Sequence, residues 1–247
     1  MNDYDAIVNP VVEKHTAMVG PVAVMAACKP DLEPLSSLLG YSRANKRRLL
    51  ISRLYHDEHR ADVAALAGPM IGAPYATMIL ESLIVRGARR ILFLGWCGAL
   101  SPDLQIGDLV IPSAALVGEG TSPNYPPGVS QTSPSAEIIA AVEGALADED
   151  MHAHQAKIWT TDAAFRETRE QVTSFQTQGA VAVDMETSAL FAVAAYRQVD
   201  IGAVLVVSDS LAGESWQPGF KTAQFKTGRR AAHHLVNILC QRLHPQK

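Results

Sequence analysis

Short apolar, β-branched runs separated by helical patterns constrain the fold of this chain more than any other feature of its sequence. The strongest run covers residues 201–208 (IGAVLVVS), and another covers residues 90–94 (RILFL). Helical stretches lie between such runs, as at residues 76–87, where apolar side chains recur at helical spacing up to a terminal Gly87. Strands that are apolar on both faces must be covered on both sides. The pattern therefore predicts an α/β fold with a sheet between two layers of helices.

Composition narrows the class of protein further. Hydrophobic residues make up 48% of the chain and charged residues 19%, and no linker divides residues 1–247, so we expect one domain with a large core. The net charge is −4 and the basic residues are dispersed, which argues against a nucleic-acid polymer as partner. No apolar run reaches the ~18 residues of a membrane helix, and the N-terminus is polar. We expect a cytoplasmic protein without a membrane partner.

Three strand ends carry residues with chemical potential, and ligands of α/β folds gather at the carboxyl ends of strands. These junctions are residues 95–98 (GWCG), 183–187 (VDMET) and 208–210 (SDS). Each has a structural explanation: a tight turn, a helix-end charge in the first turn at Glu186, and a capping carboxyl at Asp209. The functional alternative is a site in which Glu186 accepts hydrogen bonds from two vicinal hydroxyls while Asp209 shares a proton with a leaving group.

Other local patterns favour structural roles. Residues 48–54 (RLLISRL) are predicted to form one strand. Residues 56–59 (HDEH) lack a third ligand and are predicted to be a solvated helix, and the three dispersed cysteines suggest neither a disulfide framework nor a zinc site. His233 and His234 are expected at the surface. No metal site is predicted.

Six motifs occur together in the order typical of one enzyme family. They are residues 68–74 (GPMIGAP), 94–100 (LGWCGAL), 107–110 (GDLV), 119–122 (EGTS), 183–186 (VDME) and 207–209 (VSD). From about residue 68 to its C-terminal helix the chain resembles the nucleoside phosphorylase family, which includes purine nucleoside phosphorylase, uridine phosphorylase and methylthioadenosine nucleosidase. The resemblance implies a three-layer α/β/α sandwich with a central mixed sheet, and cleavage of the N-glycosidic bond of a nucleoside.

The resemblance also implies roles for individual residues. Those placed around the nucleoside are Gly95, Trp96, Gly98, Phe165, Arg166, Met185, Glu186, Ser208 and Asp209. Met185 and Glu186 would hold the ribose, and Asp209 would protonate or hydrogen-bond the departing base. Phe165 would stack on the base, whose identity the sequence does not reveal. Cleavage of the C–N bond builds positive charge on the sugar and negative charge on the base, so a ribose clamp beside a proton source fits this chemistry.

The chain departs from the family where phosphate binds. Phosphorylases place an arginine shortly after the first strand and another on the strand before the glycine turn, and Leu32 and Phe93 stand there instead. Without them most of the bidentate grip on phosphate is lost. Lys29, Arg43 or Arg166 are the candidate replacements.

The activity first expected is phosphorolysis to the free base and ribose 1-phosphate, with inorganic phosphate as co-substrate and no metal or organic cofactor. The main alternative is hydrolysis, with Asp31 as the base that activates water, since nucleosidases of the family carry a carboxylate at about this position. A further alternative is a nucleoside-binding member without turnover. The family pairs its subunits, so the resemblance also implies at least a homodimer in which the neighbour's N-terminal region completes the site.

Overall fold

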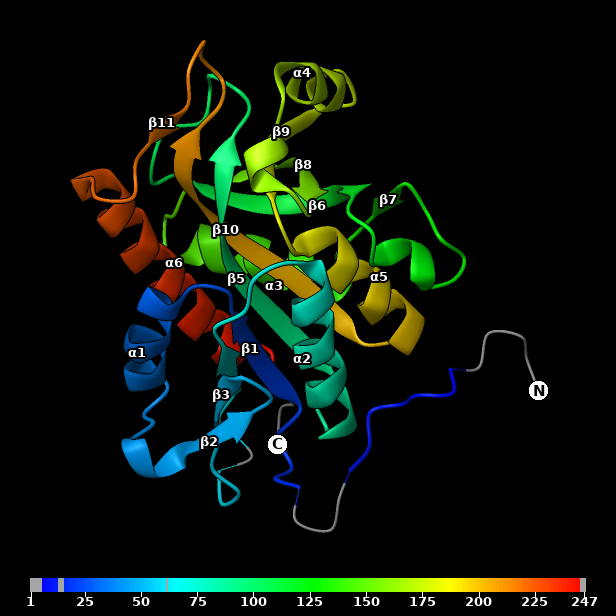
Figure 1. The fold of residues 1–247 in the computed structure, drawn as a ribbon. Coiled ribbons are helices and arrows are strands. Elements are labelled where there is room, and N and C mark those ends of the chain that lie inside the picture. The colour runs from blue at the N-terminus through cyan, green and yellow to red at the C-terminus, as the bar shows by residue number, and fades with distance from the viewer. Residues whose placement is uncertain (1–5, 13–15, 61, 245–247) are drawn as a thin grey trace.

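The computed structural model describes residues 6–12, 16–60 and 62–244 as a mixed sheet covered by helices (Figure 1). The strands are β1 (Val22–Ala26), β2 (Lys46–Leu49), β3 (Ser52–Tyr55), β4 (Ala65–Gly68), β5 (Arg90–Ala99), β6 (Leu109–Gly118), β7 (Gln131–Thr132), β8 (His154–Thr161), β9 (Ala180–Asp184), β10 (Asp200–Ser210) and β11 (Gln217–Pro218). The helices are α1 (Lys29–Leu38), α2 (Ala73–Val85), α3 (Ala136–Asp148), α4 (Arg169–Thr177), α5 (Thr187–Arg197) and α6 (Ala223–Arg242), with short 3₁₀ turns η1 (Arg43–Asn45), η2 (Ser122–Asn124) and η3 (Ala164–Arg166).

The sheet contains both parallel and antiparallel pairs. β1 pairs in parallel with β4 and β5, and β5 pairs in parallel with β10. β10 also pairs antiparallel with β6, and the run β6–β8–β9 returns to β5, so these five strands form a closed circuit. The carboxyl ends of β1, β5, β9 and β10 meet at one edge of this circuit, which is where the candidate site lies.

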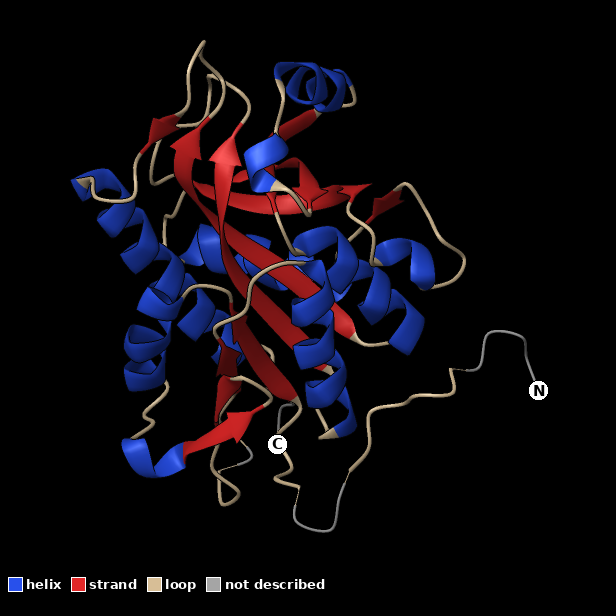
Figure 2. Cartoon of the chain, in the orientation of Figure 1, coloured by secondary structure: helices blue, strands red, loops and turns tan. Residues whose placement is uncertain are grey.

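Helices cover the sheet on both sides (Figure 2). α2 and α5 pack on each other and share one apolar core with the strands, built around residues such as Ile79, Leu83 and Phe191. α1, α3 and α6 enclose a second core on the other side, built around residues such as Leu35 and Val236. The expected three-layer α/β/α sandwich with a central mixed sheet is therefore confirmed. None of the helices in the described part of the chain is long and apolar enough to cross a membrane.

Three local predictions were wrong. Residues 48–54 form two strands rather than one, because Leu50 adopts a left-handed φ of 53° and turns the chain between β2 and β3. Residues 95–98 do not form a turn: they continue β5, which pairs with β10 and β9 on its two sides. Residues 56–59 are not helical, and His56 is buried, which lowers its pKa.

Candidate active site

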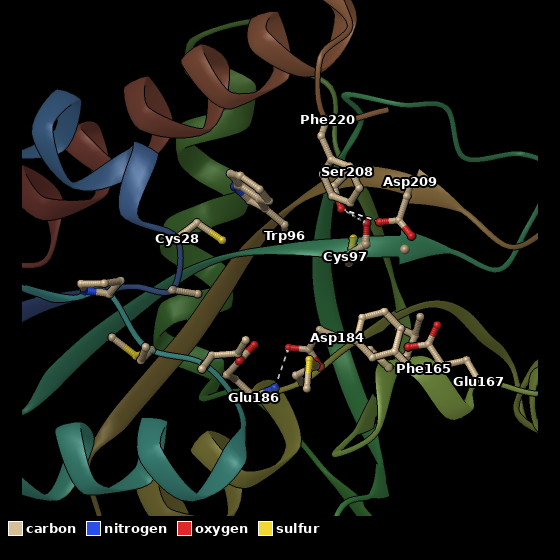
Figure 3. A pocket seen from close by; sticks show the side chains of 18 of the residues that line it. Cys28, Trp96, Cys97, Phe165, Glu167, Asp184, Glu186, Ser208, Asp209 and Phe220 are labelled. Atoms are coloured by element: carbon tan, nitrogen blue, oxygen red, sulfur yellow. Dashed lines mark hydrogen bonds between the residues drawn. The ribbon is translucent and has the colours of Figure 1, made fainter. Parts of the chain in front are cut away.

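A cavity of about 870 Å³ opens at the carboxyl ends of β1, β5, β9 and β10 (Figure 3). Its lining includes four carboxylic residues, Glu167, Asp184, Glu186 and Asp209, and a set of apolar and aromatic side chains. The latter include Ile51, Met70, Ile71, Tyr75, Trp96, Phe165, Met185, Leu211, Trp216 and Phe220. A largely apolar cavity with a few convergent polar groups is the usual form of a small-molecule site.

Glu186 lies at the junction of β9 and α5, where it is the N-cap residue and only 6% exposed. Its Oε1 accepts a hydrogen bond of 2.6 Å from the backbone N–H of Gly72, which begins α2 with a positive φ of 78°. Burial, and secondarily the charge of Asp184, raise the pKa of Glu186 to about 8. The expected helix-end stabilisation of its charge is thus outweighed by the loss of hydration.

Asp184 holds this junction together. Its carboxylate accepts hydrogen bonds from the Thr160 hydroxyl at 2.6 Å, from the Thr187 backbone N–H at 2.9 Å and from the Thr187 hydroxyl at 2.5 Å. The Glu186 N–H also points to it, at 3.3 Å. Burial raises the pKa of Asp184 all the same. With its lone pairs committed to the protein, Asp184 fixes the backbone that aims Glu186 into the cavity.

Asp209 lies at the other end of the cavity, near the end of β10 (Figure 3). A register shift between Val207 and Asp209 interrupts the pairing with β5, and such irregularities re-aim side chains beside sites. The carboxylate accepts hydrogen bonds from Ser208 Oγ at 2.6 Å and from Trp216 Nε1 at 2.7 Å. A Cβ at Gly98 would come within 3.2 Å of Asp209 Oδ2 and 2.7 Å of Leu211, so this strand position leaves no room for a side chain.

The segment between β8 and α4 forms the outer part of the lining. Phe165 in η3 lines the cavity, and its side chain is fully exposed (102%). Glu167 follows, and burial together with the negative charge of Asp209 raises its pKa to about 7. Arg166, which the resemblance placed beside the base, is exposed and absent from the lining.

The structure places Asp31 behind the cavity rather than in it. Its carboxylate is 1% exposed and accepts hydrogen bonds from Trp96 Nε1 at 2.8 Å, Arg229 Nε at 2.8 Å and His233 Nε2 at 2.7 Å. Trp96 lines the cavity and lies between the cavity and Asp31. The predicted surface position of His233 was wrong, because this partner buries it to 5% exposure. Asp31 thus links α1, β5 and α6 instead of facing a water molecule.

The site residues predicted from the sequence fall into those that line the cavity and those that lie outside it. The lining of the cavity includes Glu186, Met185, Trp96, Gly98, Phe165, Ser208 and Asp209, and their roles toward a nucleoside stay predictions. Gly95 does not, because it is buried within β5 where an added Cβ would lie 2.9 Å from the Phe93 ring. Lys29 is exposed at the start of α1 and also outside the lining, and the side chain of Arg43 lies outside the described part of the structure.

The motif at residues 119–122 has a structural role. Glu119 is buried and accepts hydrogen bonds from the Thr121 N–H, from the backbone and hydroxyl of Ser122, and from the Ser188 hydroxyl at 3.0 Å. It ties the loop after β6 to the first turn of α5, close behind Glu186.

Several lining residues were missed from the sequence. Cys28, Ser52, Tyr75, Glu167, Trp216 and Phe220 belong to this set. Most of them lie on connections whose path depends on contacts distant in sequence, as when Trp216 reaches Asp209. Only Cys28 carried a usable signal, since it follows directly on the carboxyl end of β1.

The fold and the cavity define an α/β sandwich with a largely apolar cavity and carboxylic side chains at the ends of its strands. A model of the phosphorylase superfamily matches residues 21–241, and the chain therefore belongs to that superfamily. Its members compared below are nucleoside phosphorylases and nucleosidases.

Among curated proteins, the chain is similar to a guanosine phosphorylase of Halorubrum lacusprofundi, with 32% identity over 141 residues, which is 57% of this chain and 58% of that protein. It is also similar to a DeoD-type purine nucleoside phosphorylase of Bacillus cereus, with 27% identity over 150 residues, covering 60% and 63% of the two chains. The match thus spans about three fifths of these relatives.

Among solved structures, purine nucleoside phosphorylase of Toxoplasma gondii in complex with immucillin-H gives a TM-score of 0.78 at 20% identity, covering 91% and 92% of the two chains. AMP nucleosidase of Bacteroides thetaiotaomicron gives 0.70 at 22% identity, covering 91% and 89%. Futalosine hydrolase of Helicobacter pylori gives 0.74 at 20% identity, covering 91% and 99%. At these identities the likeness concerns the fold.

The first prediction concerns Asp31. Asp31→Asn leaves the Arg229 guanidinium without its counter-charge and weakens the buried hydrogen bond to His233, so we expect the free energy of unfolding to fall by about 3 kcal/mol in urea titration. The matched control is Asp148→Asn, which breaks the exposed pair with Arg242 and should change stability by less than about 1 kcal/mol. If Asp31→Asn instead unfolds like the parent but loses turnover by orders of magnitude, Asp31 acts in catalysis.

The second prediction concerns the buried carboxyl of Glu186. A group whose pKa rises from 4.5 to about 8 on folding destabilises the protein progressively as pH increases across that window. Glu186→Gln removes this effect, so the Tm of the variant relative to the parent should increase between pH 5 and pH 8, measured by calorimetry without ligand. The exposed carboxyl of Glu143 in α3 is the control, since Glu143→Gln should shift Tm equally at both pH values. A Tm difference for Glu186→Gln that does not change with pH would show that its carboxyl is ionised throughout.

Proposed function

We propose that this protein cleaves the N-glycosidic bond of a nucleoside. The observation that carries the proposal is the presence of Glu186 and Asp209 at opposite ends of one cavity, each held by protein donors and each aimed inward. As the C1′–N bond breaks, the sugar acquires positive charge and the base acquires negative charge. A carboxylate beside the ribose and a hydrogen-bonding carboxyl beside the base match these two developing charges.

Glu186 serves the ribose end in this proposal. In the empty cavity it holds a proton at neutral pH, because burial raises its pKa to about 8. Two vicinal hydroxyls that donate to it would favour the ionised form, so nucleoside binding displaces that proton. Met185 lines the cavity next to it and packs against a face of the sugar.

Asp209 serves the base end. The hydroxyl of Ser208 and the indole N–H of Trp216 fix its orientation. Phe165 is the aromatic side chain on the same side of the cavity that can stack on the base (Figure 3).

For the acceptor of the ribosyl group, the cavity favours water over the phosphate expected from the sequence. Among the described side chains that line it there is no lysine, arginine or histidine, while four are carboxylic. A phosphate dianion in such a pocket lacks opposing charge. Water carries no charge and therefore needs no opposing cation. An oxocarbenium-like sugar reacts with a nucleophile as weak as water, so hydrolysis does not require Asp31 as a base, and the hydrogen bonds of Asp31 hold it away from the cavity.

Phosphorolysis is the second candidate, because the curated relatives are named as phosphorylases. It requires a cation that the described lining lacks, supplied by the side chain of Arg43 or by a second protomer.

The third prediction separates these acceptors. A panel of purine and pyrimidine nucleosides is incubated with the protein in phosphate-free buffer and in buffer with phosphate, and the sugar product is identified. We expect free ribose at the same rate in both. Ribose 1-phosphate formed only with phosphate would replace hydrolysis by phosphorolysis, and no base release from any nucleoside would reject N-glycosidic cleavage.

The fourth prediction concerns Asp209. Asp209→Asn keeps the size of the side chain but removes the charge that faces the departing base, so kcat should fall on the order of 10²–10³-fold with little change in KM. Asp200→Asn, at the start of the same strand and outside the cavity, is the matched control and should retain activity. Parallel losses of rate and of affinity for an unreactive nucleoside analogue would assign Asp209 to binding alone.

A further inference from the structure

A second carboxyl group lies at the same end of the cavity as Asp209. Glu167 lines the cavity together with Phe165, and its electrostatic partner is Asp209 on the facing strand end (Figure 3). The two carboxyls come from segments that are 42 residues apart in sequence, by the numbers of Glu167 and Asp209. Their meeting is a product of the fold.

The position of Glu167 is well defined by its neighbours. Thr168, the next residue, is the N-cap of α4 and forms a capping box with Gln171. This box fixes the direction in which the chain enters α4. Glu167 is therefore held at a helix entry, with its side chain turned into the cavity.

The two sides of this end of the cavity are fastened to each other. Arg169 in α4 donates to the carbonyls of Leu211 at 3.3 Å, Gly213 at 2.8 Å and Glu214 at 3.0 Å. These carbonyls belong to the loop after β10 that carries Trp216, the donor to Asp209. The contacts fix the segment of Glu167 relative to the loop that orients Asp209.

The hydrogen bonds around Asp209 do not identify the group that supplies a proton to the departing base. Both of its oxygens are acceptors, one from Ser208 and one from Trp216. Glu167 has a pKa of about 7, because burial and the charge of Asp209 both oppose its ionisation. Because this pKa lies close to neutrality, the Glu167 carboxyl can hold a proton at this end of the cavity.

We propose that Glu167 is a catalytic residue that delivers the proton to the departing base, while Asp209 accepts a hydrogen bond from the base and orients it. The inference rests on the proposed function. In the step, the C1′–N bond breaks and its electron pair stays on the base. A ring nitrogen of the base takes the proton from the Glu167 carboxyl, which becomes a carboxylate. The acceptor water bonds to C1′ and releases one proton to the surrounding solvent, and the carboxylate of Glu167 takes up one proton from solvent, so the step is balanced.

The charged groups around Glu167 favour this role. Asp209 on β10 is the charge that acts on it. Arg169 on α4 is occupied by three carbonyls, and Arg166 on η3 is exposed and outside the lining. Glu170 and Glu214 are exposed. No cation among these groups forms an ion pair with Glu167 in the described structure.

The test is the pH dependence of kcat/KM for a cleaved nucleoside in the parent, in Glu167→Gln and in the control Glu170→Gln, which changes an exposed carboxyl three residues further on. A protonated Glu167 is the active form, so kcat/KM of the parent and of the control, each divided by kcat/KM of Glu167→Gln at the same pH, should fall as pH rises through about 7. Glu167→Gln should lose ~10²-fold at pH 6, the scale of general acid catalysis. Ionisation of Glu186 acts in the opposite direction and is common to all three proteins.

An unchanged kcat/KM in Glu167→Gln, or a loss by the same factor at every pH, would overturn the proposal. A second measurement does not depend on turnover. The infrared spectrum of Glu167→Gln at pH 6 is subtracted from that of the parent, and the difference is searched for the carboxylic-acid band of Glu167. The band should be present and disappear above about pH 8. Its absence at pH 6 refutes the protonated Glu167, whereas its presence without any base release refutes only the proposed function.

Discussion

The parallel pairing of β10 with β5 is the interaction on which the site depends. It runs from Asp200 opposite Arg90 to Ser210 opposite Ala99 and carries the apolar run of β10 through the centre of the molecule. The register shift near its end places Asp209 opposite Gly98, the same residue that pairs with Val183 of β9. Because Gly98 has no side chain, the strand ends that carry Asp209 and Glu186 converge on one space. A larger residue there would fill the cavity that the convergence creates.

Burial gives the carboxyls of this cavity different properties. Burial raises the pKa of all three buried carboxyls, but Asp184 accepts hydrogen bonds from four donors and acts as a scaffold, while Glu186 and Glu167 have few donors and face the cavity. Carboxyl groups whose surroundings give them different pKa values commonly serve as the acid and the base of an enzyme. Such carboxyls lower the free energy of unfolding when they ionise, because a buried carboxylate without enough hydrogen-bond donors is unfavourable in the folded protein.

Much of this could be predicted from the sequence, and the exceptions have physical causes. The ends of strongly apolar strands mark Asp209 and Glu186, because a carboxyl directly after a buried strand is conspicuous. Glu167 stands in a polar stretch, RETRE, where it resembles an ordinary helix-end charge. His233 was misjudged although Arg229, His233, Val236 and Cys240 recur at helical spacing on one face of α6. Its partner Asp31 is 202 residues away in sequence, so their contact leaves no local signal.

The pairing of Asp31 with Arg229 also bears on the acceptor. Arg229 is a cation in contact with the cavity lining, because its guanidinium lies 5.3 Å from the centroid of the Trp96 ring and forms a cation–π contact with it. Yet Asp31 neutralises it at 2.7 Å, and Trp96 packs edge-on against Phe225 at 4.8 Å between centroids, which closes this side. Phosphate could use Arg229 only by breaking a buried ion pair and moving an aromatic ring, and both changes are costly. The resemblance to nucleoside phosphorylases implies that Leu32 stands where those enzymes have a phosphate arginine, and its lack of charge acts in the same direction. This side of the cavity is thus closed by Trp96 and its nearby cation is already paired with Asp31, which supports the proposal of water as the acceptor.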